Sequence, residues 1–188
     1  MRLLAVIGAL AIIVAILAAG YFFLGFYNVA ASQDDPQIVA WALPKVRDAS
    51  IDRHSVGLTP PVKLDDQAVI QAGARAFSQR GCFTCHGAPG VDWAKFSEGL
   101  HPDPPDLKEV ADDEARMLFW VIKNGINMTG MPSFALAGAK DEEIWSIVAF
   151  LKKLPIISEA DYKSWTAPPP PPPAPAPPPD ANAPPAAK

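Results

Sequence analysis

The chain has 188 residues and a formal net charge of −4, with 20 acidic and 16 lysine or arginine side chains. This length predicts one ordinary domain with appendages. The sequence contains no basic run of the kind that suits nucleic acid, which argues against a nucleic-acid-binding protein. The composition changes along the chain, so each part is considered in turn.

Residues 3–26 carry no charged side chain and are long enough to cross a bilayer as a helix, which needs about 20 apolar residues. Arg2 precedes this run, and a positive charge on the short side favours a cytoplasmic N-terminus. We therefore expect residues 1–27 to be a single-pass anchor in a bacterial cytoplasmic membrane, with the rest of the chain in the periplasm. The alternative is a cleaved signal peptide, but the apolar region of such a signal spans only about 7–15 residues.

Residues 28–65 are predicted to be a periplasmic linker. Within it, VAWALPKV (residues 39–46) could form one short amphipathic turn that rests on the membrane or on a partner. His54 also lies in this linker. A lone histidine in such a segment is more often solvated than a ligand.

Residues 66–157 are predicted to form the folded domain, which is all-α. Apolar side chains recur at helical spacing in three segments, and acidic residues open the last two of them, as suits a helix N-terminus. The predicted helices are residues 66–80, 112–124 and 141–153. A domain of about 90 residues buries little core on its own, so a large apolar cofactor would form much of its interior.

Residues 158–188 are predicted to be a disordered Pro/Ala-rich tail. From Pro168 onward, twelve of twenty-one residues are proline. Such a composition favours an extended polyproline-II conformation and cannot pack a core. The tail is either a solvated extension or a spacer that docks on a partner, and the sequence favours the first.

Both cysteines of the chain, Cys82 and Cys85, lie in RGCFTCHGAPG (residues 80–90), and His86 follows directly. C-x-x-C-H is the attachment signature of c-type haem. Two thiols at this spacing reach the two vinyl groups of a porphyrin and form thioethers, and the adjacent imidazole binds the iron. A zinc site normally needs four ligands, and a structural disulfide leaves the histidine unexplained. We therefore expect one covalently attached haem c.

Methionine completes the iron coordination in electron-carrying haem proteins and raises the reduction potential. NGINMTGMPSF (residues 124–134) offers Met128 and Met131 in a loop that follows His86. Pro132 restricts Met131 to an extended backbone, which would hold its side chain at a defined height. We therefore expect His86 and Met131 to be the axial ligands, and Met131 is favoured over Met128.

These motifs resemble those of class I c-type cytochromes, specifically the membrane-anchored monohaem bacterial kind. The resemblance covers about residues 66–157 and rests on GCFTCHG, on PPDL at 104–107, on LFWVIKNGINMTGMPSF and on WSIVAFLKKLP. It implies that Gly73 and Phe77 pack against the last helix near Phe150. It also implies that a proline carbonyl, from Pro104 or Pro105, accepts a hydrogen bond from Nδ1 of His86.

The expected function is single-electron transfer between respiratory proteins, with membrane lipid as the partner of the anchor. The redox partners would be a quinol-oxidising complex, a dehydrogenase or a terminal oxidase, and the protein itself would not be an enzyme. One alternative is a dedicated cytochrome subunit of a membrane dehydrogenase or oxidase complex. Others are an enzyme or gas sensor with an open iron, and a purely structural anchor. Trp93 and His101 are weaker candidates for hydrogen bonds to the haem propionates.

Overall fold

The computed structural model describes residues 1–168. These residues form helices and loops and contain no β-strand beyond an isolated bridge between Ala88 and Val91. The all-α fold class is therefore confirmed for this part of the chain. The predicted Pro-rich tail from residue 169 lies outside the described residues.

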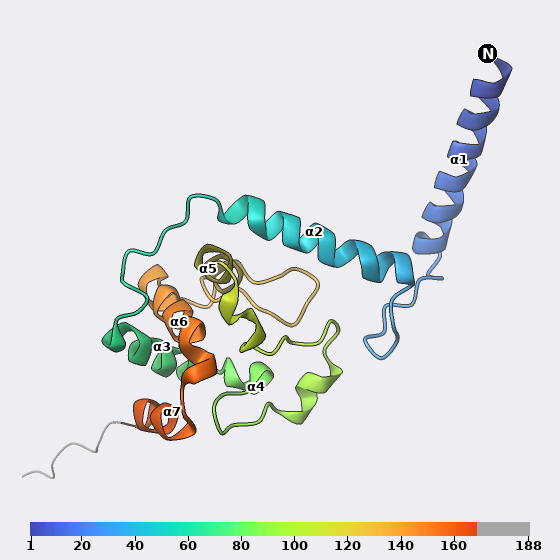
Figure 1. Ribbon diagram of the computed structural model, residues 1–188. Coiled ribbons are helices and arrows are strands. Elements are labelled where there is room, and N and C mark those ends of the chain that lie inside the picture. The colour runs from blue at the N-terminus through green and yellow to red at the C-terminus, as the bar shows by residue number, and fades with distance from the viewer. Residues whose placement is uncertain (169–188) are drawn as a thin grey trace, which may run out of the picture.

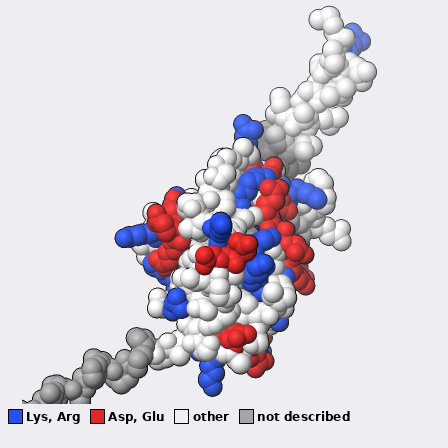
Figure 2. Space-filling model, turned by 60° about the vertical axis from the view of Figure 1, so that its left-hand side comes forward, with Lys and Arg blue, Asp and Glu red and all other residues white. Residues whose placement is uncertain are grey.

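Helix α1 (Arg2–Phe23) leaves the domain as a single straight rod (Figure 1). Its mean hydropathy is 2.9, and among the described residues it alone is long and apolar enough to cross a membrane. Figure 2 shows this helix white along its length, with basic atoms only near its free end. A signal sequence near the N-terminus can also form a helix of this length and hydropathy, so the helix is consistent with either an anchor or a signal.

The core is built around α6 (Asp141–Lys153), which packs against α3 (Gln67–Gln79) and α5 (Ala115–Asn124), while α7 (Glu159–Thr166) packs on α3 (Figure 1). Every α6 residue from Ile144 to Leu151 is buried, because neighbouring elements cover more than one side of the helix. The acidic residues in its first turn and the lysines in its last turn match the helix dipole. The boundaries of α6 are those that the sequence predicted.

Helices α3 and α6 touch through Gly73, where the resemblance places the contact. A Cβ atom on Gly73 would lie 1.8 Å from the carbonyl oxygen of Ser146, so only glycine allows this approach. Next to it, the rings of Phe77 and Phe150 lie 5.2 Å apart. The expected packing of Gly73 and Phe77 near Phe150 is confirmed. Helix α3 begins one residue later than predicted, because Asp66 acts as its N-cap and accepts from Ala68 N at 2.8 Å.

The second predicted helix is shorter than expected. Residues Glu109–Asp112 form a 3₁₀ turn, η2, and α5 starts only at Ala115. The acidic residues 112–114 therefore precede the helix and do not form its first turn. A short α4 (Phe83–His86) and further 3₁₀ turns, η1 (Lys95–Gly99) and η3 (Leu154–Ile156), complete the described elements.

Two helices lie where the sequence predicted a linker and a tail. Helix α2 (Gln37–Ser55) continues through Pro44 and packs on α5, where a short turn was expected. Helix α7 forms within the predicted tail. Ser158 caps it by accepting from Asp161 N at 3.1 Å, and its Tyr162 is buried against Phe150. In both cases contacts with distant residues stabilise a segment whose local pattern is weak.

Candidate functional site

The C-x-x-C-H motif forms one helical turn. Cys82 is the N-cap of α4, and its carbonyl accepts hydrogen bonds from the backbone N–H groups of Cys85 and His86. Residues three and four apart lie on one face of a helix. The two thiols and the imidazole are therefore presented to the same side of the turn. Both cysteines are free, so no disulfide ties up the sulfur atoms.

Burial sets the chemistry of the first thiol. It raises the pKa of Cys82 to about 12, although the positive charge of Arg80 opposes this effect. A redox-active C-x-x-C pair works through a thiolate whose pKa is lowered. The raised pKa of Cys82 is opposite in direction to the shift that this chemistry needs.

His86 is held by a backbone carbonyl. Its Nδ1 lies 3.0 Å from the carbonyl oxygen of Pro105, and because a carbonyl can only accept, Nδ1 carries the proton. The lone pair is then on Nε2, the nitrogen that can bind a metal. Burial lowers the pKa of His86, while the bond to Pro105 acts in the opposite direction. The imidazole is thus neutral and oriented, as a metal ligand must be.

The loop that carries the methionines is anchored on the end of α5. Gly125 has a φ of +70° and ends the helix, and a Cβ atom there would lie 2.7 Å from the carbonyl oxygen of Met131. Ile126 N donates to that carbonyl at 3.1 Å, and Met131 N donates to Thr129 Oγ1 at 3.1 Å. The backbone at Met131 is therefore fixed from both sides.

The two methionines differ in environment. Met131 is half-buried and packs against the hydrophobic core, as Cys82 and Phe83 also do. Met128 is 87% exposed and has a φ of +60°. Of the two methionines, only Met131 therefore packs against the apolar interior, and this burial favours it over Met128 as the candidate ligand.

The space beside the motif is partly open. A hollow of about 270 Å³ adjoins Cys85 and is also lined by Trp93, Ser97, Glu98, Asp103 and Pro104. Free thiols in one turn, a neutral imidazole and a half-buried thioether form a donor set that fits haem c. If a haem is attached, Cys82 and Cys85 would hold it, and His86 and Met131 would be its ligands.

The weaker candidates, His101, His54 and Trp93, differ in their surroundings. His101 faces Asp35, with 3.5 Å between Nε2 and the carboxylate. His54 is exposed, and its Nδ1 bonds to the carbonyl oxygen of Ser50 in the same helix. Trp93 is half-exposed and lies at the hollow beside Cys85.

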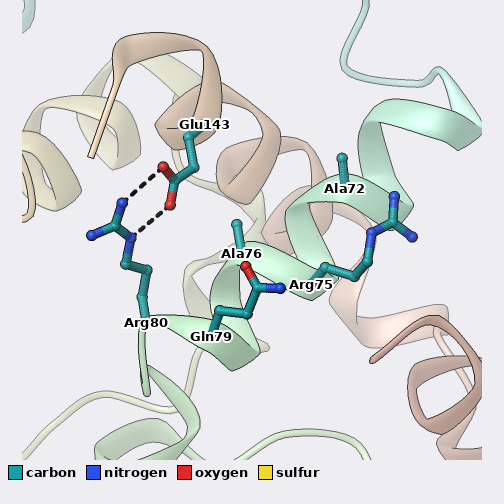
Figure 3. Close-up of a pocket in the computed structure, with 6 residues that line it drawn as sticks. All are labelled: Ala72, Arg75, Ala76, Gln79, Arg80 and Glu143. Atoms are coloured by element: carbon teal, nitrogen blue, oxygen red, sulfur yellow. Dashed lines mark hydrogen bonds and ion pairs between the residues drawn. The ribbon is translucent and has the colours of Figure 1, made fainter. Parts of the chain in front are cut away.

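A larger hollow of about 410 Å³ lies between α3 and α6 (Figure 3). Its lining is Ala72, Arg75, Ala76, Gln79, Arg80 and Glu143. None of the predicted site residues takes part. Arg80 and Glu143 form a two-point ion pair across it, with N–O distances of 2.6 and 2.9 Å. This hollow is thus separate from the candidate haem site.

The all-α fold and the C-x-x-C-H turn are consistent with a c-type cytochrome domain. The family model described as "Cytochrome C oxidase, cbb3-type, subunit III" matches residues 68–151, less than half of the chain. This match agrees with the resemblance to class I monohaem cytochromes. No curated protein and no solved structure matches the chain.

Proposed function

We propose that the protein is a membrane-anchored monohaem cytochrome c that carries single electrons between respiratory proteins on the periplasmic face. The cytochrome domain at residues 68–151 supports electron transfer, and α1 supports the anchor. The observation that carries the proposal is the environment of His86. Its Nδ1 is engaged by Pro105, so Nε2 is free to act as a ligand next to two free thiols.

Each site residue has a role in this proposal. Cys82 and Cys85 would hold the haem through their sulfur atoms, and His86 and Met131 would be the ligands of its iron. When bound, the haem supplies a one-electron iron couple, whose potential rises with a methionine ligand. The protein fixes both ligands through Pro105 and through the hydrogen bonds of the 124–134 loop. Redox partners on either side would be a quinol-oxidising complex or a dehydrogenase, and a terminal oxidase.

A second candidate function has the same haem chemistry, but places the protein as a fixed subunit of one enzyme complex. The matching family is described as an oxidase subunit, which favours a dedicated cytochrome subunit of a membrane oxidase or dehydrogenase complex. Purification of the tagged chain from membranes in mild detergent separates the two. Stoichiometric copurification of an oxidase or dehydrogenase favours the subunit, and isolation of the chain alone favours the shared carrier.

The experiment that tests the haem assignment is an optical titration of the full-length protein with carbon monoxide. Wild type, Met131→Ala and Met128→Ala are reduced and exposed to the gas. We expect the low-spin spectra of wild type and Met128→Ala to stay unchanged when carbon monoxide is added. Met131→Ala should bind the gas and change its spectrum. If wild type binds the gas readily, its sixth position is open. The protein would then be a ligand-binding sensor or an enzyme and not a carrier.

A further inference from the structure

One face of helix α2 packs against the domain. Ile51 and Ser55 are buried against it. Arg116 of α5 donates to Ser55 Oγ at 2.6 Å and to the Asp52 carboxylate at 2.7 Å. These contacts fix the rotation of α2 about its own axis, and so they decide which side chains face outward.

The opposite face of α2 exposes apolar side chains. At 3.6 residues per turn, Val46 points away from Ile51 and Ser55, and Ile38 and Leu43 lie on either side of it. Ile38 is 74% exposed, Leu43 51% and Val46 65%. We call Ile38, Leu43 and Val46 the α2 outer face.

The chain itself indicates what covers this face. Residues 24–36 join α1 to α2, and they are folded back against the domain: Asp35 accepts a hydrogen bond from Tyr27 and lies 3.5 Å from His101 Nε2. The start of α2 is therefore held close to the end of α1. In Figure 1, α2 runs across the side of the domain from which α1 leaves. A bilayer that contains α1 would end next to this side.

The composition of α2 suits a lipid surface. Trp41 lies on the flank of α2, beside the outer face, and is exposed, and tryptophan is a side chain typical of the membrane interface. Lys45, Arg47 and Arg53 supply cationic groups on the same helix, although Arg47 also pairs with Asp48. Of the two acidic residues in α2, Asp52 is neutralised by Arg116. Basic side chains beside apolar ones attract an anionic headgroup layer.

We propose that the α2 outer face lies in the headgroup region of the bilayer that α1 spans. This inference rests on the proposed membrane anchoring. The anchor and α2 then form two separate contacts with one membrane, so the domain has a defined orientation. Helix α4 lies on the far side of the domain from α2 in Figure 1, so the C-x-x-C-H turn would lie on the side of the domain away from the bilayer.

Cysteine reactivity in the full-length, haem-loaded protein tests this orientation. In the haem-loaded protein Cys82 and Cys85 would be thioethers and would not react. A newly introduced cysteine is then the one reactive thiol. The test variants are Leu43→Cys and Val46→Cys. The water control is Leu136→Cys, at a side chain that is 92% exposed in the methionine-loop region, and the bilayer control is Ile13→Cys in α1. Each variant is placed in nanodiscs that contain anionic lipid, at one copy per disc, and treated with a membrane-impermeant maleimide.

We expect Leu43→Cys and Val46→Cys to react roughly ten-fold or more slowly than Leu136→Cys, because the reactive thiolate is disfavoured in a low dielectric. Rates equal to that of Leu136→Cys, with Ile13→Cys still protected, would overturn the inference and leave the anchor intact. A fast reaction at Ile13→Cys would instead overturn the anchoring on which the inference rests. Protection that appears only with several copies per disc would indicate contact between two chains and would also refute lipid contact.

Discussion

The Nδ1 of His86 and the carbonyl oxygen of Pro105 lie 3.0 Å apart, across nineteen residues of chain. This hydrogen bond connects the C-x-x-C-H turn to the loop before η2. It also fixes the orientation of the His86 imidazole, which we propose as an iron ligand. A hydrogen bond at Nδ1 makes the imidazole more basic at Nε2. A more basic ligand stabilises the higher charge of ferric iron and lowers the reduction potential.

Pro105→Gly should therefore raise the midpoint potential of the haem. Glycine makes the backbone at residue 105 more flexible, so its carbonyl would hold the hydrogen bond to His86 less firmly. A hydrogen bond contributes about 0.5–1.5 kcal/mol, which for a one-electron couple corresponds to roughly 20–60 mV. Spectroelectrochemical titration measures the change. Pro104→Gly is the matched control, since its carbonyl does not accept from His86. Equal shifts in the two variants would show that general loosening of the loop, and not this hydrogen bond, sets the potential.

Gly73→Ala should destabilise the domain by roughly 3 kcal/mol, because overpacking a close helix contact costs about 1–3 kcal/mol or more. The added Cβ would meet the Ser146 carbonyl at 1.8 Å, and backbone cannot swing aside as a side chain does. Denaturant unfolding monitored by Trp fluorescence checks this. Gly99→Ala is the control, because no atom lies within 4 Å of its added Cβ. Similar midpoints for the two variants would contradict the α3–α6 contact.

Glu143→Gln should lower stability at neutral pH by about 0.5–1 kcal/mol, the upper range for a partly exposed ion pair. The hydrogen bonds from Arg80 hold the pKa of Glu143 below its usual value. A carboxyl with a depressed pKa stabilises the folded state above its unfolded pKa, and this contribution is lost as the pH falls through the folded pKa.

The difference between wild type and Glu143→Gln should accordingly be largest near pH 7 and shrink below about pH 4. Urea unfolding across this range measures it. Glu142→Gln, at the exposed neighbouring carboxylate, leaves the ion pair intact and serves as the comparison. A difference that stays constant down to acidic pH would indicate an effect other than the ionised pair.

Arg116→Ala should release α2 from α5. The substitution removes the hydrogen bonds to Asp52 and Ser55 that join α5 to α2, so amide exchange in the second half of α2 should rise roughly ten-fold or more. Hydrogen exchange with mass spectrometry reads this directly. Lys123→Ala, which breaks an α5–α6 pair with Asp141, should leave α2 protected. Unchanged exchange in α2 after Arg116→Ala would show that apolar packing alone holds it.

The sequence predicted correctly those helices whose charged end residues and apolar stripe lie within the helix itself. Helix α6 has acidic residues at its start, lysines at its end and an apolar stripe between, and its boundaries were predicted correctly. Helix α2 was missed because Pro44 disfavours a helix locally. The groups that stabilise it, Arg116 above all, lie more than sixty residues away in the chain. Helix α7 was missed for a similar reason, since the burial of Tyr162 is a tertiary effect.

The sequence alone was enough to propose the candidate site, but not all of its contacts. The C-x-x-C-H spacing alone points to Cys82, Cys85 and His86, because the chemistry fixes that spacing. The choice between Pro104 and Pro105 as the acceptor for His86 was left open, since the register of a twenty-residue loop depends on long-range packing. The preference for Met131 over Met128 gained support from burial. The assignment of the ligands themselves stays a prediction until the gas titration is done.

The hydrogen bonds of the 124–134 loop have a consequence for the speed of electron transfer. Met131 is fixed through Ile126 and Thr129, and His86 is fixed through Pro105, by groups that do not change with the charge of the iron. With both residues as ligands, neither would need to move when the iron gains or loses an electron. Such a site has a small reorganisation energy, since its dipoles are already in position. Electrons could then pass rapidly between partners whose potentials differ only slightly.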